Sequence, residues 1–109
     1  MGKIGPQKID SKFITELYSA VLMLKSNKEI RMFFRDVMTE QEILEFARRW
    51  KAARMLNAKT PYTEIIGVTG LSSATIARIS KWLNAGAGGY RLILKRQNEH
   101  HRFSSAGKK

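Results

Sequence analysis

The sequence predicts an all-α fold of about six helices that includes a helix-turn-helix. Apolar residues recur at the three- and four-residue spacing of amphipathic helices, and no window alternates in the way that strands do. Short segments rich in Gly, Pro, Ser or Asn separate these periodic stretches. With 109 residues, 43% of them apolar, and no visible repeat, the chain fits a single domain with terminal extensions.

The first two predicted helices carry stripes of large apolar side chains. The first begins near Asp10 or Ser11, and Asn27 is expected to cap the second. Glycines and a proline lie between lysines in residues 1–10, which are therefore expected to form a flexible basic arm. The stripe residues are Phe13, Ile14, Leu17, Tyr18, Val21 and Leu22 in the first helix, and Ile30, Phe33, Phe34, Val37 and Met38 in the second.

The third predicted helix begins with a capping box and ends near Asn57. Thr39 and Glu42 have the spacing at which each side chain can accept a free backbone N–H of the other residue. Trp50 and Trp82 are interpreted as core residues because they share helical spacing with other apolar residues, and the alternative is a stacking platform for single-stranded nucleic acid. The expected core face of the third helix comprises Ile43, Leu44, Phe46, Ala47, Trp50, Ala53 and Leu56.

Residues 61–84 have the pattern of a helix-turn-helix. Thr60 is expected to cap its first helix, and the proline that follows to occupy the first helical position, where a missing N–H costs nothing. Gly70 supplies the left-handed backbone that a sharp turn requires, and Ser72 or Ser73 caps the second helix. The residues expected to face inward are Ile65, Leu71, Ile76, Ile79 and Leu83.

The outward face of the second helix predicts binding to double-stranded DNA. Its residues are small and polar near the helix start and basic farther along, which suits close approach to base edges with phosphate contacts beside them. Two helices around a glycine turn also occur in proteins that bind no DNA, and here the net charge favours DNA binding. The residues predicted to contact DNA are Ser72, Ser73, Ala74, Thr75, Ala77, Arg78 and Lys81.

A final helix is expected over about residues 90–97, after a glycine-rich loop. It carries the apolar residues Leu92, Ile93 and Leu94. Residues 98–109 are polar and basic, so we expect a disordered tail with at most a non-specific role in contacting phosphates.

Composition narrows the classes of function. The net charge of +11 and the sequence pI near 10.4 favour a polyanionic partner, and nucleic acid, an anionic membrane surface and an acidic protein all qualify. Because Cys is absent and the two histidines, His100 and His101, are adjacent in the polar tail, we expect no metal, no cofactor and no enzymatic activity. No apolar run approaches the ~20 residues of a membrane span and none resembles a signal peptide, so we expect a cytoplasmic location and no membrane partner.

Resemblance to a known family sharpens these expectations. The run from Gly70 to Arg78 resembles the turn and recognition helix of the Trp repressor superfamily, whose Ala-Thr-Ile-x-Arg signature it matches. Residues 11–97 are therefore expected to form a Trp-repressor-like DNA-binding domain. The resemblance implies an intertwined homodimer in which the N-terminal and C-terminal helices of two chains share one core. Further runs that resemble the TrpR-related YerC/YecD family are Ala47-Arg48-Arg49, Ala53-Arg54-Met55-Leu56 and Leu83-Asn84 followed by Gly88-Gly89-Tyr90.

The same resemblance bears on the ligand of that family, L-tryptophan. The corepressor pocket of the Trp repressor lies between the central helix and the recognition helix, and two arginines and a glycine help to define it. The resemblance places Arg49 and Arg78 at the arginines, but Ile79 at the glycine and Trp82 at a serine. We expect these larger side chains to fill a vestigial effector pocket, so that no L-tryptophan is bound.

The sequence thus predicts a dimeric, sequence-specific transcriptional regulator, a repressor that occupies a pseudo-palindromic DNA operator. Its two recognition helices would lie about one turn of DNA apart, ~34 Å. Two alternatives remain open because the net charge supports any polyanion. One is a protein that binds DNA or RNA with low specificity, and the other is an adaptor that docks an acidic partner.

Overall fold

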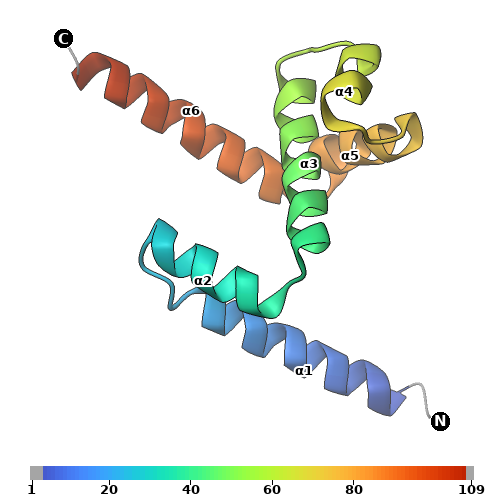
Figure 1. The fold of residues 1–109 in the computed structure, drawn as a ribbon, viewed down its shortest axis with the longest axis vertical. Helices are drawn as coiled ribbons and strands as arrows, with labels where there is room; N and C mark the ends of the chain where they lie inside the picture. Colours follow the sequence, from blue (N-terminus) through green and yellow to red (C-terminus); the bar gives the residue numbers. More distant parts are fainter. Residues whose placement is uncertain (1–3, 108–109) are drawn as a thin grey trace. The chain divides into compact units, whose positions relative to one another are not determined.

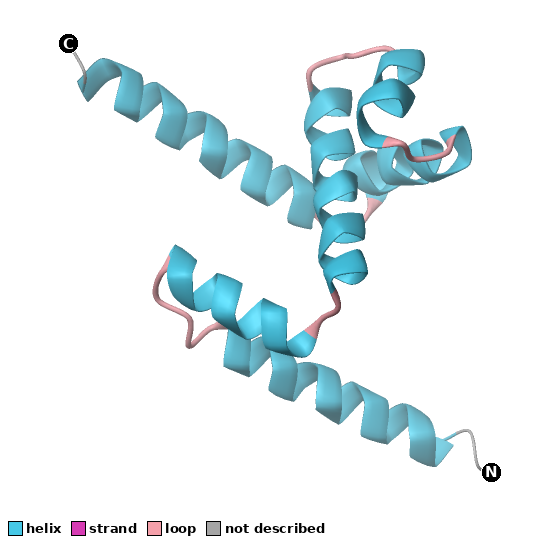
Figure 2. Cartoon of the chain, in the orientation of Figure 1, coloured by secondary structure: helices cyan, strands magenta, loops and turns pink. Residues whose placement is uncertain are grey.

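The computed structural model describes residues 4–107, with side chains described for residues 10–100, and over that range it contains six α-helices and no strand (Figures 1 and 2). The all-α prediction and the number of helices are confirmed. The helices are α1 (Ile4–Val21), α2 (Asn27–Val37), α3 (Glu40–Asn57), α4 (Tyr62–Thr69), α5 (Ser73–Ala85) and α6 (Gly89–Gly107).

The chain divides into two compact units, residues 1–43 and residues 44–109. The first holds α1 and α2 together with the first turn of α3, and the second holds the remainder of α3 and the helix-turn-helix. No helix in the described part of the chain is long and apolar enough to cross a membrane.

The first unit differs from the sequence prediction at the starts of both its helices. Helix α1 already begins at Ile4, within the expected flexible arm; Pro6 is compatible with this because N–H groups in a first turn have no partner within the helix. Ser26, and not Asn27, caps α2, and its hydroxyl accepts the N–H of Glu29 at 3.2 Å. Among residues 10–43, no described side chain is buried.

Helix α3 begins with the predicted capping box. The N–H of Thr39 donates to Oε1 of Glu42 at 2.9 Å, and the N–H of Glu42 donates to Oγ1 of Thr39 at 3.1 Å. The predicted core face is wrong over the first half of this helix, where Leu44, Phe46 and Ala47 are exposed. The helix contributes fully buried side chains only farther along, where α4 and α5 cover it.

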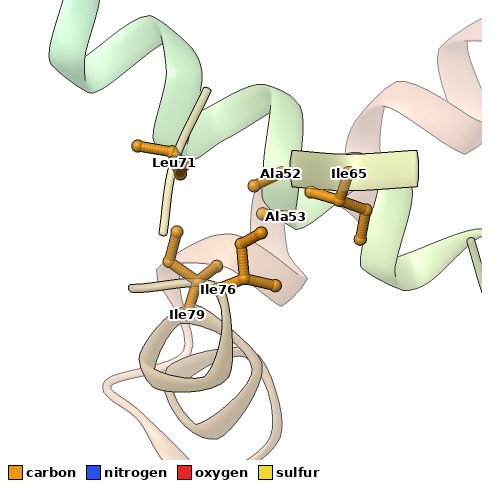
Figure 3. Packing of buried hydrophobic residues seen from close by; sticks show 6 residues of the cluster. All are labelled: Ala52, Ala53, Ile65, Leu71, Ile76 and Ile79. Atoms are coloured by element: carbon orange, nitrogen blue, oxygen red, sulfur yellow. The ribbon is translucent and has the colours of Figure 1, made fainter. Parts of the chain in front are cut away.

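The core of the second unit lies where α3, α4 and α5 meet. Two alanines of α3 and isoleucines of α4 and α5 pack together there (Figure 3), and small side chains on one helix leave room for branched ones on its neighbours. Trp50, Met55, Leu56 and Tyr90 pack against this cluster and are partly buried. The cluster consists of Ala52, Ala53, Ile65, Leu71, Ile76 and Ile79.

The connection from α3 to α4 departs from the predicted cap. Pro61 itself is the N-cap residue of α4, with φ −62° and ψ 149°, and no side chain caps the helix. Thr60 belongs instead to the end of α3, because its N–H donates to the carbonyl of Met55 at 2.9 Å.

Helix α6 starts one residue earlier than expected and continues to Gly107, through most of the predicted disordered tail. Residues 1–3 of the predicted arm and 108–109 of the tail lie outside the described residues. Tyr90, near the start of α6, stacks on Trp50 with ring centroids 6.2 Å apart and ring planes 17° from parallel. Trp82 is 43% exposed, so the prediction that it is a core residue is wrong for the single chain.

Candidate nucleic-acid interface

The turn between α4 and α5 depends on one glycine and one threonine. Gly70 ends α4 with φ 74°, in the left-handed region as predicted, and its N–H donates to the carbonyl of Ile66 at 2.8 Å. The buried hydroxyl of Thr69 donates to the carbonyl of Ile65 at 2.7 Å and accepts the N–H of Leu71 at 3.2 Å. The sequence analysis did not predict this role of Thr69. The only sign of it in the sequence is that Thr69 directly precedes the turn glycine.

Ser72 caps α5, one of the two caps predicted. Its hydroxyl oxygen accepts the N–H of Thr75 at 3.1 Å, and the hydroxyl donates to Oγ1 of Thr75 at 3.0 Å. These two bonds occupy the Ser72 hydroxyl and fix the first turn of α5, so the direction in which the helix leaves the turn is set locally.

Helix α5 presents opposite faces to the core and to solvent. Ile76, Ile79 and Leu83 are buried, and the first two point toward the alanines of α3 in Figure 3. Thr75 is half-buried. The other side chains predicted to contact DNA are all exposed, and they are Ser72, Ser73, Ala74, Ala77, Arg78 and Lys81. The structure therefore brings the predicted set together on the outward side of the turn and of one helix.

The positive charge of the chain is concentrated in the unit that carries this helix. Residues 44–109 contain 13 Lys and Arg against 3 Asp and Glu, whereas residues 1–43 contain 7 against 6. Helix α5 has no acidic residue. An exposed helix without carboxylates in a strongly basic unit favours contact with a polyanion.

The four residues of the predicted effector pocket are in different surroundings. Ile79 is fully buried in the core, whereas Arg78 is exposed on α5. Nε of Arg49 lies 3.3 Å from Oε2 of Glu45, and the Arg49 guanidinium lies 5.7 Å from the ring centre of Phe46. Trp82, the fourth residue, lines a hollow of about 610 Å³ with the loop after α5 and with α6, and the other three residues do not line this hollow.

Arg49 also lies close enough to Tyr90 to act on its phenol. Burial raises the pKa of Tyr90 above its ordinary value of 10.0, and the positive charge of Arg49 offsets part of this rise. The partly exposed Arg49 side chain thus has a carboxylate, an aromatic ring and a phenol of its own chain nearby.

In the described part of the chain, no group of three or more His, Cys, Asp and Glu residues is arranged to hold a metal ion.

Comparison with known proteins identifies relatives over most of the chain. The sequence matches the family described as Trp repressor protein over residues 12–98. It is 37% identical over 99 residues to the YerC protein of Bacillus subtilis (strain 168), a match that covers 91% of this chain and 95% of that protein.

Solved structures agree with these matches. A TrpR-like protein from Eubacterium eligens ATCC 27750 has a TM-score of 0.78 to this chain at 37% identity, covering 84% of this chain and 95% of the other. A Staphylococcus aureus protein assigned as a Trp repressor has a TM-score of 0.76 at 34% identity, covering 84% of this chain and 92% of the other. The chain therefore belongs to the Trp repressor family.

Proposed function

We propose that this chain is a sequence-specific regulator of transcription that binds double-stranded DNA and represses by occupying an operator. The observation that carries the proposal is the outward face of α5. Its buried side holds the helix on the core, while Ala74, Ala77 and Arg78 remain accessible on the other side. Such a helix enters the major groove with its first turns toward base edges, and basic residues farther along contact bases or phosphates.

We propose further that two copies bind together. Large apolar side chains remain exposed on α1 and α2, and one chain leaves them in contact with water. On a pseudo-palindromic site, the two recognition helices of such a dimer would lie about one turn of DNA apart, ~34 Å. The exposed residues of these helices include Phe13, Ile14, Leu17, Tyr18, Ile30, Met32 and Val37, and Leu22 and Met23 are exposed in the connection between them.

DNA binding by this chain is proposed to need no L-tryptophan. The position that the family's repressor keeps open with a glycine holds Ile79, whose side chain is part of the closed core. Arg49 pairs with Glu45 and lies over Phe46, so a ligand carboxylate would have to compete with these contacts. Adding millimolar L-tryptophan should therefore leave the affinity for DNA unchanged, whereas a tryptophan-dependent gain would contradict this part of the proposal.

The test is selection of bound duplexes from a random library, followed by binding measurements on the selected sequence. An enriched palindrome is expected, because each copy of α5 reads one half-site. Arg78→Ala should weaken binding to the selected duplex by about 1–3 kcal/mol if Arg78 contacts a base, and much less to a scrambled duplex. Fluorescence anisotropy at several salt concentrations gives both affinities.

A matched control separates base contacts from general charge. Lys51→Ala removes one positive charge from an exposed position of α3, so its effect should be similar on the selected and the scrambled duplex. Equal losses for Arg78→Ala on the two duplexes would support a protein that binds nucleic acid with low specificity. If no duplex or RNA is retarded at physiological salt, the proposal fails, and that is the outcome expected of an adaptor that docks an acidic protein.

A further inference from the structure

Two exposed methyl groups lie on the solvent side of α5. Ala74 and Ala77 are both exposed and are three residues apart, so their methyl groups lie on the same side of the helix. Ile76 and Ile79 cover the core on the other side. Side chains this short allow the helix backbone to come close to whatever the face contacts.

Two of the hydroxyl groups near these alanines, those of Ser72 and Thr75, are bonded to each other. The Ser72 hydroxyl is used in both directions, since it accepts the N–H of Thr75 and donates to Oγ1 of Thr75. Thr75 is in addition half-buried. In the first two turns of α5, the exposed side chains are Ser73, Ala74, Ala77 and Arg78, so two of the four end in a methyl group. A methyl group cannot form a hydrogen bond with a base edge.

We infer that Ala74 and Ala77 recognise thymines through the C5 methyl group in the major groove. This inference rests on the proposed function, in which α5 enters that groove. The thymine methyl is the apolar group that a base pair displays there, and alanine is among the side chains that contact it. Each operator half-site should therefore carry thymine at positions that face these two alanines, with Arg78 reading a neighbouring base or phosphate.

Deoxyuridine provides the test, because it lacks only the C5 methyl group and keeps the hydrogen-bonding groups of thymine. Each thymine of the selected half-site is replaced in turn, and the dissociation constant is measured by anisotropy at constant salt. We expect a loss of roughly three- to fivefold at one or two positions, the factor for one buried methyl group. Replacement of thymines outside the half-sites should have no effect.

Glycine variants assign each sensitive thymine to its alanine. Ala74→Gly and Ala77→Gly each remove one protein methyl group. The loss of affinity on replacing the facing thymine by deoxyuridine, the uracil penalty, should then disappear, while the penalty at the thymine facing the other alanine remains. Ala85→Gly is the matched control, since Ala85 is exposed in the last turn of the same helix. Circular dichroism checks that each variant is folded. If a variant is unfolded, the deoxyuridine replacements measured with the unaltered protein decide the question.

The outcomes distinguish this inference from the proposed function on which it rests. Specific binding that is indifferent to every uracil replacement would overturn the role of the methyl groups and leave the regulator proposal standing. Uracil penalties that persist in both glycine variants would also overturn it, because another group would then contact the thymines. If no sequence is enriched from the library, the proposed function fails and the inference fails with it.

Discussion

Lys59 is the one non-glycine residue of the described backbone with a positive φ, at 66°. It ends the last turn of α3, where its N–H donates to the carbonyl of Leu56 at 3.0 Å. This arrangement satisfies carbonyls that have no partner within the helix, and it usually employs glycine. A side chain in the left-handed region costs roughly 1 kcal/mol, and Lys59 is exposed, so no core contact offsets that cost.

Lys59→Gly should therefore stabilise the fold. We expect the free energy of unfolding, measured by urea denaturation, to rise by about 0.5–1 kcal/mol. Lys51→Gly is the matched control, because Lys51 is an exposed lysine within α3, where glycine should cost about 1 kcal/mol. Destabilisation by both variants would show that the Lys59 side chain makes a contribution larger than its backbone strain.

Tyr90 gives a prediction for alkaline pH. Its pKa is raised by burial, with Arg49 offsetting part of the rise, so the folded state holds the phenol proton more tightly than the unfolded chain. The resulting stabilisation is fully present below the unfolded pKa of about 10 and is lost as the pH rises through the folded-state pKa.

Tyr90→Phe removes this dependence. The stability advantage of the unaltered protein over Tyr90→Phe should shrink as the pH is raised from about 9 to about 12, measured by urea denaturation at each pH. Tyr62→Phe, at an exposed tyrosine of α4, is the matched control. An advantage that grows with pH would contradict the direction of the shift.

At the scale of elements, the helix-turn-helix depends on the buried Thr69 hydroxyl. Thr69→Val keeps the shape of the side chain but leaves the N–H of Leu71 without its acceptor, which should lower the free energy of unfolding by about 1–3 kcal/mol. Thr63→Val, at an exposed threonine of α4, should change stability by less than about 0.5 kcal/mol. Thermal unfolding gives the stability of each variant. Equal losses of stability for Thr69→Val and Thr63→Val would show that the Thr69 hydroxyl makes no special contribution.

Which element boundaries could be predicted depends on the range of the interactions that make them. The capping box of Thr39 and Glu42, the left-handed Gly70 and the Ser72 cap each involve residues within a few positions, so the sequence alone specified them. Ser26 and Asn27 are both good caps, and the choice between adjacent candidates depends on where the chain enters the helix.

Burial was harder to predict than helicity. Periodicity correctly identified the inward face of α5, including Ile76 and Ile79, because α3 covers that face within the same chain. The same reasoning assigned Leu44, Phe46 and Trp82 to the core, yet all three are exposed. A helical stripe shows which side is apolar and gives no information on what covers it.

The two units of the chain differ in how much apolar surface they bury and in their charge. The unit from residue 44 onward has a closed core and most of the positive charge. In residues 10–43, by contrast, none of the described side chains is buried, although large apolar residues lie along both α1 and α2. A unit that buries so little has little to offset the entropy of folding, so a second copy that covers it would contribute directly to stability.

Two valines of similar exposure test this. Val37 on α2 is 52% exposed and Val68 on α4 is 56% exposed, so in a monomer Val37→Asp and Val68→Asp should have similar small effects. If the faces of α1 and α2 form the dimer interface, Val37→Asp places a charge in that interface and should dissociate the dimer, whereas Val68→Asp should not.

Sedimentation and thermal unfolding read out the difference. The unaltered protein should sediment at twice the 12.4 kDa mass of the chain, with a Tm that rises with protein concentration because folding and association are linked. Val37→Asp should shift the mass toward 12.4 kDa and lower the Tm, and Val68→Asp should leave both nearly unchanged. A single-chain mass for the unaltered protein at micromolar concentration, with a Tm independent of concentration, would exclude the dimer and leave the apolar faces of α1 and α2 without a partner.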